Sequence, residues 1–430
     1  MTAALEKCDG ACSRDRGSMT SNGTTTRPEM ERPANTQLRQ GGNAGPAKGT
    51  SYFAGPLFAL CLGVLVAAGA PAASAQTSIS FPPFLEMRVP KPPTVAASEK
   101  GPFLAYEVHV TNFTPQPVTL KKLEVMSSPD AQVIFTLSDS GLMRAVSRPG
   151  MAPAAQAERL KVNGGMRAVV FLWVPVTGAA PKSIQHRLTI ESGTGDSVRT
   201  QTLDGAGVPV TAQAVVIGPP LRGGTWLAAN GPADASGHRR SLIPISGTPA
   251  IAQRFAIDWV KVDDKDKTSK GDSLKNESYY AEGVDALAVA NGTVVEVKDG
   301  IPENVPGINS RAVPITLETV GGNHVIIDIG GGYYAFYAHL KPGSLKVKLG
   351  DKVTRGQVVG HVGNTGNSTE PHLHFHVADA NSPLGSEGVP YRMDFDVVGH
   401  CASFGATCQR SAPVARKGEV PLENALIRFP

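Results

Sequence analysis

The segment Pro371-His-Leu-His-Phe-His-Val377 alternates histidine with large apolar residues. Alternate side chains of a β-strand share a face, so His372, His374 and His376 would point to one side while the residues between them pack into a core. Neighbours on one face lie about 6.7 Å apart, close enough for two imidazoles to converge on a metal ion or on a substrate beside it. Packing alone explains three such imidazoles poorly, because an unpaired imidazole is costly to bury. The segment therefore predicts a β-strand that carries a metal or catalytic site.

Further strand-like runs lie on the N-terminal side of this segment. Short apolar runs occur at Thr293–Val297, Val325–Ile329 and Tyr333–His339, and no long stretch has the period of a helix. The glycine- and proline-rich stretch Gly218–Gly224 precedes them and is typical of a linker. We therefore predict an antiparallel β-sheet domain over residues 218–400.

A second set of strand-like runs precedes the linker, and 430 residues are many for a single domain. The runs Leu104–Val110, Ala168–Val174 and His186–Ile190 are separated by Pro, Gly, Ser and Asp, as in a β-sandwich. The stretch VHVTNFTPQPVTLKKLEV, Val108–Val125, resembles immunoglobulin-like modules found beside bacterial enzymes. The predicted fold class is all-β, with an immunoglobulin-like β-sandwich over residues 79–217 followed by the antiparallel sheet domain.

Residues 1–75 have the features of a leader that ends in a signal peptide. Tyr52–Ala70 is apolar, follows several arginines and precedes Ala73-Ser-Ala75, which matches the A-x-A cleavage pattern. Its strongly apolar part, Leu57–Ala68, is shorter than the ~20 residues that a membrane-spanning helix needs. We predict cleavage after Ala75, export to the periplasm or the medium, and no membrane span in the mature protein.

The polar start of the chain is unlike an ordinary signal peptide. The first fifty residues are polar and rich in Gly, Thr and Asn, and they are too long for the charged region that opens such a peptide. They are predicted to be disordered, or to precede a true start at Met19, Met30 or later.

The cysteines indicate one disulfide bond. Cleavage of the leader removes three of the five cysteines and leaves Cys401 and Cys408. An oxidising compartment favours a bond between them. Residues 401–430 are therefore predicted to form a disulfide loop and a C-terminal tail.

The residues around the histidine-rich segment resemble a known signature. The stretch GDKVTRGQVVGHVGNTGNSTEPHLHFHV, Gly350–Val377, closely resembles that of the lysostaphin- or LytM-type zinc metalloendopeptidases. The resemblance continues upstream through GGNHVIIDIGGGYYAFYAHL, Gly321–Leu340, and more weakly through QRFAIDW, Gln253–Trp259. It covers residues 254–378, which we take as the core of a LytM-type peptidase domain.

This resemblance implies a zinc site and a role for four residues. His374 and Asp258 would be zinc ligands, and His339 and His372 would flank the zinc-bound water. Zinc acidifies a bound water enough for it to attack an amide at neutral pH. The two flanking histidines would take up the proton of the water and stabilise the charge that develops on the tetrahedral intermediate.

The sequence departs from the family at the third ligand. The family places a histidine four residues before the aspartate, but this chain has Arg254 there. Arginine stays protonated and has no lone pair to offer a metal. Three alternatives follow: His238 or His376 completes the site, the domain has lost zinc and catalysis, or a water fills the shell. We favour a displaced histidine, His238 first, and expect His238→Ala to remove the metal.

Two functions are compatible with these residues. The first is a zinc metalloendopeptidase that hydrolyses peptide bonds in peptidoglycan stem peptides or cross-bridges. The alternative is a degenerate LytM-like regulator that binds and activates another cell-wall hydrolase, and Arg254 is its main support. A wall-binding module without catalysis ranks last, because it leaves the three-histidine face unexplained.

The composition argues against a nucleic-acid partner. Charged residues make up 18% of the chain, and the net charge is only +4 without a long run of one sign. We therefore predict no nucleic-acid partner, whereas this mild positive charge does not hinder contact with anionic peptidoglycan.

Overall fold

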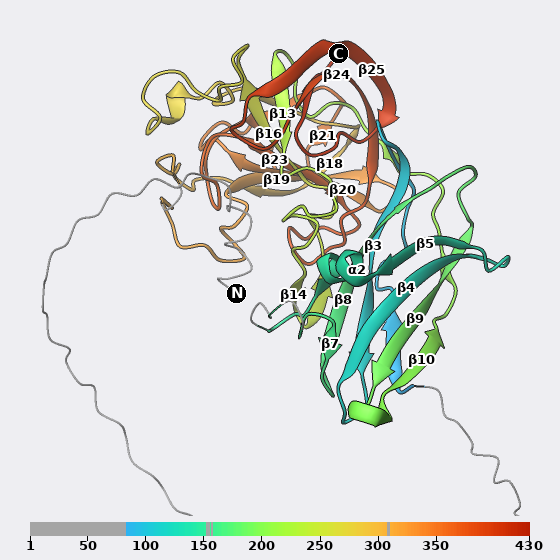
Figure 1. The fold of residues 1–430 in the computed structure, drawn as a ribbon. Coiled ribbons are helices and arrows are strands. Elements are labelled where there is room, and N and C mark those ends of the chain that lie inside the picture. The colour runs from blue at the N-terminus through green and yellow to red at the C-terminus, as the bar shows by residue number, and fades with distance from the viewer. Residues whose placement is uncertain (1–82, 152–154, 156–157, 308–309) are drawn as a thin grey trace, which may run out of the picture. The chain divides into compact units, whose positions relative to one another are not determined.

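The computed structural model describes residues 83–151, 155, 158–307 and 310–430, and its elements are almost all β-strands (Figure 1). The prediction of an all-β protein is confirmed. Within the described residues no helix is long and apolar enough to cross a membrane. The predicted leader, signal peptide and cleavage site lie outside the described residues.

Two antiparallel sheets form the N-terminal half. In the first, the order is β1-β3-β8-β6 with β2 paired to β3. Its strands are β1 (Leu85–Arg88), β2 (Ala96–Ser98), β3 (Gly101–Asn112), β6 (Val146–Ser147) and β8 (Arg167–Pro175). In the second, the order is β10-β9-β4-β5, with β7 paired to β4 and β11 to β9. Its strands are β4 (Val118–Ser128), β5 (Val133–Ser138), β7 (Lys161–Val162), β9 (Ser183–Ser192), β10 (Arg199–Asp204) and β11 (Val208–Pro209).

One hydrophobic core joins these two sheets. It contains Leu104 and Val108 of β3, Leu172 of β8, Leu123 of β4 and Leu188 of β9. Helix α2 (Asp139–Ala145) and the 3-10 helix η3 (Gly195–Ser197) also belong to this half. The immunoglobulin-like character of residues 79–217 stays a prediction.

An eleven-stranded sheet forms most of the C-terminal half, in the order β12-β24-β26-β13-β16-β23-β20-β19-β18-β21, with β25 paired to β24. Its strands are β12 (Val215–Val216), β13 (Thr225–Ala229), β16 (Ile257–Val262), β18 (Gly292–Lys298), β19 (Asn323–Gly330), β20 (Tyr333–Leu340), β21 (Lys352–Val353), β23 (Leu373–Ala378), β24 (Tyr391–Cys401), β25 (Cys408–Glu419) and β26 (Ala425–Arg428). All paired neighbours are antiparallel except β12 and β24. Two further two-stranded sheets pair β14 (Ile243–Ile245) with β15 (Thr248–Ala250), and β17 (Asp285–Leu287) with β22 (Val358–His361). The 3-10 helix η4 spans Asn276–Ser278.

The predicted C-terminal tail contributes strands to this sheet. β26 lies between β13 and β24, and β25 pairs with β24. Cys401 and Cys408 form the predicted disulfide at the turn between β24 and β25. The predicted domain boundaries at residues 217 and 400 remain predictions.

Strand β3 is buried on both of its faces. Its residues from Phe103 to Val110 are all buried, and one face belongs to the core of the two N-terminal sheets. The other face contributes Phe103 and Ala105 to the large core of the C-terminal half. Phe103 also stacks on Trp173 of β8, with ring centroids 4.0 Å apart. The first sheet therefore packs against the C-terminal half.

Candidate metal centre

Strand register brings together the two ligands that the family signature implied. β16 pairs with β23 so that Asp258 lies directly opposite His374. On the other side of β23, β20 pairs so that Ala338 lies opposite His374, which places His339 next to the same position. The φ of His339 is 64°, an uncommon value for a residue other than glycine, and it occurs here at the end of a strand.

His238 lies at the same place, although no strand carries it. Its Nε2 is 3.5 Å from Oδ2 of Asp258, and its ring centroid is 4.9 Å from that of His374. The ligand atoms of these three buried residues all lie within 4.8 Å of one another. His238, which the sequence proposed as a displaced ligand, is thus one of three donors that converge.

Three imidazoles are held in a defined orientation by backbone carbonyls. In each, Nδ1 faces a carbonyl oxygen: His238 faces Asn230 at 2.9 Å, His339 faces Thr365 at 2.7 Å and His372 faces Glu370 at 2.8 Å. A carbonyl oxygen only accepts, so Nδ1–H must donate, and in the neutral ring Nε2 keeps its lone pair. The Nε2 of His238 and of His372 then faces Asp258, the latter at 3.6 Å.

His374 is oriented the other way round. Its Nδ1 lies 2.8 Å from Oδ1 of Asp258, and its Nε2 lies 3.1 Å from Nδ1 of His376. The two ring nitrogens lie on different sides of an imidazole, so His376 contacts His374 away from the carboxylate. His376 therefore lies behind His374 and outside the group of converging donors, and the identity of the third ligand stays a prediction that this geometry favours for His238.

Charge at the centre is concentrated on Asp258. Burial acts to raise the pKa of its carboxyl, but the positive charges of His238 and His372, when these rings are protonated, outweigh burial and hold the pKa well below its ordinary value. Asn230 also donates from Nδ2 to Oδ2 at 2.8 Å. Burial together with His372 and His374 holds the pKa of His339 well below its ordinary value. The centre therefore combines one carboxylate with a neutral imidazole at His339.

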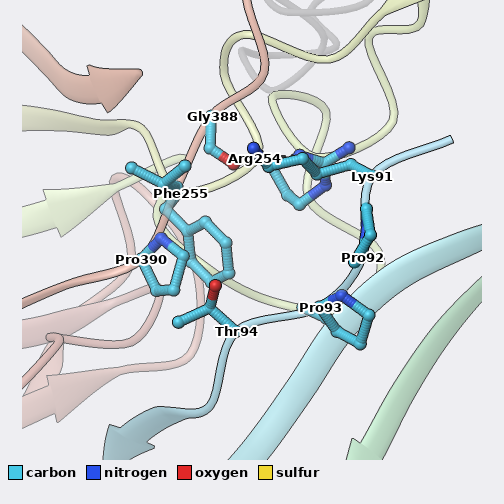
Figure 2. A pocket seen from close by; sticks show the side chains of 10 residues that line it. Lys91, Pro92, Pro93, Thr94, Arg254, Phe255, Gly388 and Pro390 are labelled. Atoms are coloured by element: carbon cyan, nitrogen blue, oxygen red, sulfur yellow. Dashed lines mark hydrogen bonds between the residues drawn. The ribbon is translucent and has the colours of Figure 1, made fainter. Parts of the chain in front are cut away.

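Arg254, at the usual ligand position, takes no part in this centre. Its Nη2 lies 2.6 Å from both Oε1 of Glu107 and Oε2 of Glu387, and Nη1 donates to the carbonyl of Gly388 at 2.9 Å. Burial would lower the pKa of its guanidinium, but the two carboxylates more than offset burial and raise it. Figure 2 shows Arg254 beside Gly388 and Lys91, where it lines a small pocket.

The donor set fits a metal that binds nitrogen and oxygen. Two imidazole nitrogens and one carboxylate oxygen are a common set for catalytic zinc, which keeps a fourth position open. Ligand atoms around tetrahedral zinc lie about 3.3 Å apart. Nδ1 of His374 lies 2.8 Å from Oδ1 of Asp258, and Nε2 of His238 lies 3.5 Å from Oδ2 of the same carboxylate, so both imidazoles already lie near that spacing from the carboxylate. His238, Asp258 and His374 could therefore hold a zinc ion after small side-chain shifts.

Comparison with known families agrees with the signature. Residues 278–385 match the family model described as Peptidase family M23. The chain thus contains a LytM-type M23 peptidase domain. His339, His372 and His374 fall inside the matched range, whereas His238 and Asp258 precede it.

Several curated proteins resemble parts of the chain. Peptidoglycan DD-endopeptidase ShyA of Vibrio cholerae is 37% identical over 98 residues, which cover 23% of this chain and 22% of ShyA. Glycyl-glycine endopeptidase ALE-1 of Staphylococcus capitis is 45% identical over 56 residues, 13% of this chain and 15% of ALE-1. The matches to the first curated relatives span about a third of their length or less.

Solved structures show similar partial matches. A catalytic-domain variant of the prophage-encoded M23 protein EnpA from Enterococcus faecalis is 26% identical, with a TM-score of 0.21, and the match covers 31% of this chain and 73% of that one. The catalytic domain of lysostaphin from Staphylococcus simulans is 21% identical, with a TM-score of 0.22, over 38% of this chain and 86% of that one.

Proposed function

We propose that the protein is an exported zinc metalloendopeptidase that hydrolyses peptide bonds in peptidoglycan stem peptides or cross-bridges. The observation that carries this proposal is the convergence of donors from His238, Asp258 and His374. Without a third donor, Arg254 would argue for a domain that had lost its metal. With His238 in place, Arg254 is explained by its ion pairs to Glu107 and Glu387.

In this proposal the three donors hold zinc and two other histidines act on the substrate. When bound, zinc would polarise the scissile carbonyl and acidify a water. His339 and His372 lie side by side, with ring centroids 4.8 Å apart, and each keeps Nε2 free of its carbonyl partner. Their Nε2 atoms can accept a proton from the attacking water and donate to the oxygen of the tetrahedral intermediate.

The substrate class is taken from the printed activities of the relatives. ShyA and ShyB are named peptidoglycan DD-endopeptidases, and ALE-1 is named a glycyl-glycine endopeptidase. The names differ in the bond cut but share peptide bonds as targets. Export is supported by the predicted signal peptide and fits the disulfide between Cys401 and Cys408.

Zinc content and wall hydrolysis test the proposal together. We would measure zinc in the purified mature chain, residues 76–430, beside His238→Ala and His374→Ala, and then incubate each protein with purified peptidoglycan. We expect about one zinc per wild-type chain, loss of zinc in both variants, and release of soluble peptides by the wild type only. Wild-type protein without zinc or activity would overturn the proposal and favour a regulator that acts through another hydrolase.

A further inference from the structure

The three proposed ligands are supported in different ways. Asp258 and His374 are cross-strand partners, so the ladder between β16 and β23 fixes their separation. His238 lies in the segment between β13 and β14, residues 230–242, which contains no strand. Its own side chain gains one hydrogen bond, to the carbonyl of Asn230. Something other than the sheet must therefore hold this segment in place.

The next residue, Arg239, is anchored in the N-terminal half. Only 1% of its surface is exposed, and its Nη2 donates to the carbonyl of Leu172 on β8 and lies 3.4 Å from the carbonyl of Tyr106 on β3. Tyr106 and Leu172 are cross-strand partners. The guanidinium also lies over the rings of Phe171 and Trp173, at 5.5 and 5.8 Å from their centroids. Arg239 thus packs on the face of the first sheet that is turned away from the core of the two N-terminal sheets.

The other side of Arg239 ties back to its own segment. Nη1 donates to the carbonyl of Asp234 at 3.0 Å and to Oδ1 of the same residue at 3.1 Å. Arg240 adds a hydrogen bond to the carbonyl of Arg144, at the end of α2, and lies over Phe171. These contacts fix the residues that follow His238 relative to β8 and tie them to Asp234, four residues before it.

Apolar packing and a buried ion pair hold the far end of the same stretch. Leu242 and Ile251 pack with Val169 and Phe171 of β8. Arg254 then pairs with Glu107 of β3, and each of the two is only 2% exposed. The stretch from His238, the proposed ligand, to Arg254, at the usual ligand position, is therefore attached to the first sheet at both of its ends.

We propose that the N-terminal sheets are a structural part of the metal centre, because the seating of Arg239 on β3 and β8 positions His238 for zinc. Arg239 is a positioning residue that acts through His238. This inference rests on the proposed function. Burial lowers the pKa of the Arg239 guanidinium to about 10, so the side chain remains charged at neutral pH. Its removal leaves the carbonyls of Leu172 and Tyr106 without this donor and frees the segment to move.

The test is a double-mutant cycle on zinc affinity in the mature chain. We would measure zinc dissociation constants by chelator competition for wild type, Arg239→Ala, His238→Ala and the double variant. We expect Arg239→Ala to weaken zinc at least about tenfold, in the range found when an orienting partner of a ligand is removed. His238→Ala should bind zinc too weakly to keep it through purification, and in that background, titrated with zinc in excess, Arg239→Ala should have no further effect.

Two further variants separate positioning from general stability. Arg187→Ala removes an exposed arginine that pairs with Asp204 in the same half, and it should leave zinc affinity unchanged. Arg239→Lys keeps the charge and most of the stem, so it should fold and lose less affinity than the alanine variant. The absorption spectrum of the cobalt-substituted protein should change in Arg239→Ala and remain near wild type in Arg187→Ala.

Each outcome has a distinct meaning. Wild-type zinc affinity in folded Arg239→Ala, or an equal loss with and without His238, would overturn this inference and leave the proposed function intact. A wild-type chain that does not bind zinc would overturn the proposed function first, and this inference with it.

Discussion

Two polar clusters contain residues only four positions apart, Arg254 and Asp258, and differ in how their negative charge is balanced. In the ion-pair cluster, Glu107 and Glu387 face the guanidinium of Arg254, a cation that the chain itself supplies. In the candidate metal centre, Asp258 faces imidazoles whose inner nitrogens are oriented by hydrogen bonds on their outer sides, from His238 to the carbonyl of Asn230 and from His374 to His376. The first cluster is complete as it stands, whereas the second has donors left over for an external cation. The comparison explains why one is structural and the other is the candidate site.

The largest expected effect comes from removing the internal cation. Arg254→Met leaves the buried Glu107 and the partly buried Glu387 without their partner, and breaking a buried pair in this way costs about 3–5 kcal/mol. Urea or thermal unfolding of the metal-free chain would measure the loss. As a control, Arg187→Met removes an exposed partner of Asp204 and should change stability little. Equal stabilities of the two variants would contradict a structural role for the ion-pair cluster.

The next largest effect is expected when the carboxylate of Asp258 in the candidate metal centre is neutralised. Asp258→Asn keeps the size of the side chain but removes the only carboxylate among the three proposed ligands. We expect zinc affinity to fall at least about 100-fold and wall hydrolysis to cease, because neutral amides are poor zinc ligands. Chelator competition and peptide release would measure both. Full zinc affinity in this variant would mean that the metal lies elsewhere.

A smaller effect on zinc affinity is expected when His376, which contacts His374 on the side away from Asp258, is replaced. His376 is buried and lies 3.1 Å from Nε2 of His374, where it can accept that N–H and direct Nδ1 toward Asp258. Replacing such an orienting partner usually lowers metal affinity by about 10- to 100-fold, and we expect the lower end for His376→Gln because an amide oxygen can still accept. His376→Phe, which cannot accept, should lose more affinity. Equal affinities of the two variants would argue against the orienting hydrogen bond.

The smallest effect concerns a buried histidine outside both clusters. His186 Nε2 lies 2.8 Å from the Tyr106 hydroxyl, and burial lowers the pKa of His186 to about 4. The unfolded chain takes up this proton near pH 6.5, so the contribution of His186 to stability falls as pH drops from about 6.5 toward 4. Between pH 7 and 5.5 the loss is about 1 kcal/mol.

A matched variant isolates that contribution. Other buried imidazoles also titrate, so the measured quantity is the difference in unfolding free energy between wild type and His186→Gln at each pH. The unfolding free energy of the wild type minus that of His186→Gln should decrease as the pH falls. A constant difference would show that His186 does not titrate in this way.

The sequence predicted the parts of the site that strands determine. Alternation at Leu373–Ala378 and the family signature placed His374 on a strand, and its pairing with Asp258 follows from register. The roles of His339 and His372 stay predictions, although both lie beside the converging donors. The face on which a strand residue lies follows from its position in the alternating pattern, so it can be predicted from the local sequence.

The remaining parts depend on contacts that are distant in sequence. The convergence of His238 on Asp258 and His374 depends on the path of the segment at 230–242, which has no periodic pattern. The ion pair of Arg254 with Glu107 joins residues 147 positions apart, so no local pattern could indicate it. One feature of the sequence did indicate that the first sheet is covered on both faces. Ala168–Val174 is apolar at every position, which is typical of such a strand.

The position of β26 constrains the order in which the C-terminal half can assemble. This strand follows all others in sequence, yet it lies inside the sheet between β13 and β24. Trp226 and Leu227 of β13 pair with it, and β13 leads directly to Asn230 and the ligand segment. A chain that crosses a membrane from its N-terminus would keep this sheet divided until residues 425–428 emerge. In the proposed exported enzyme, this sheet would therefore be completed only after residues 425–428 have crossed the membrane.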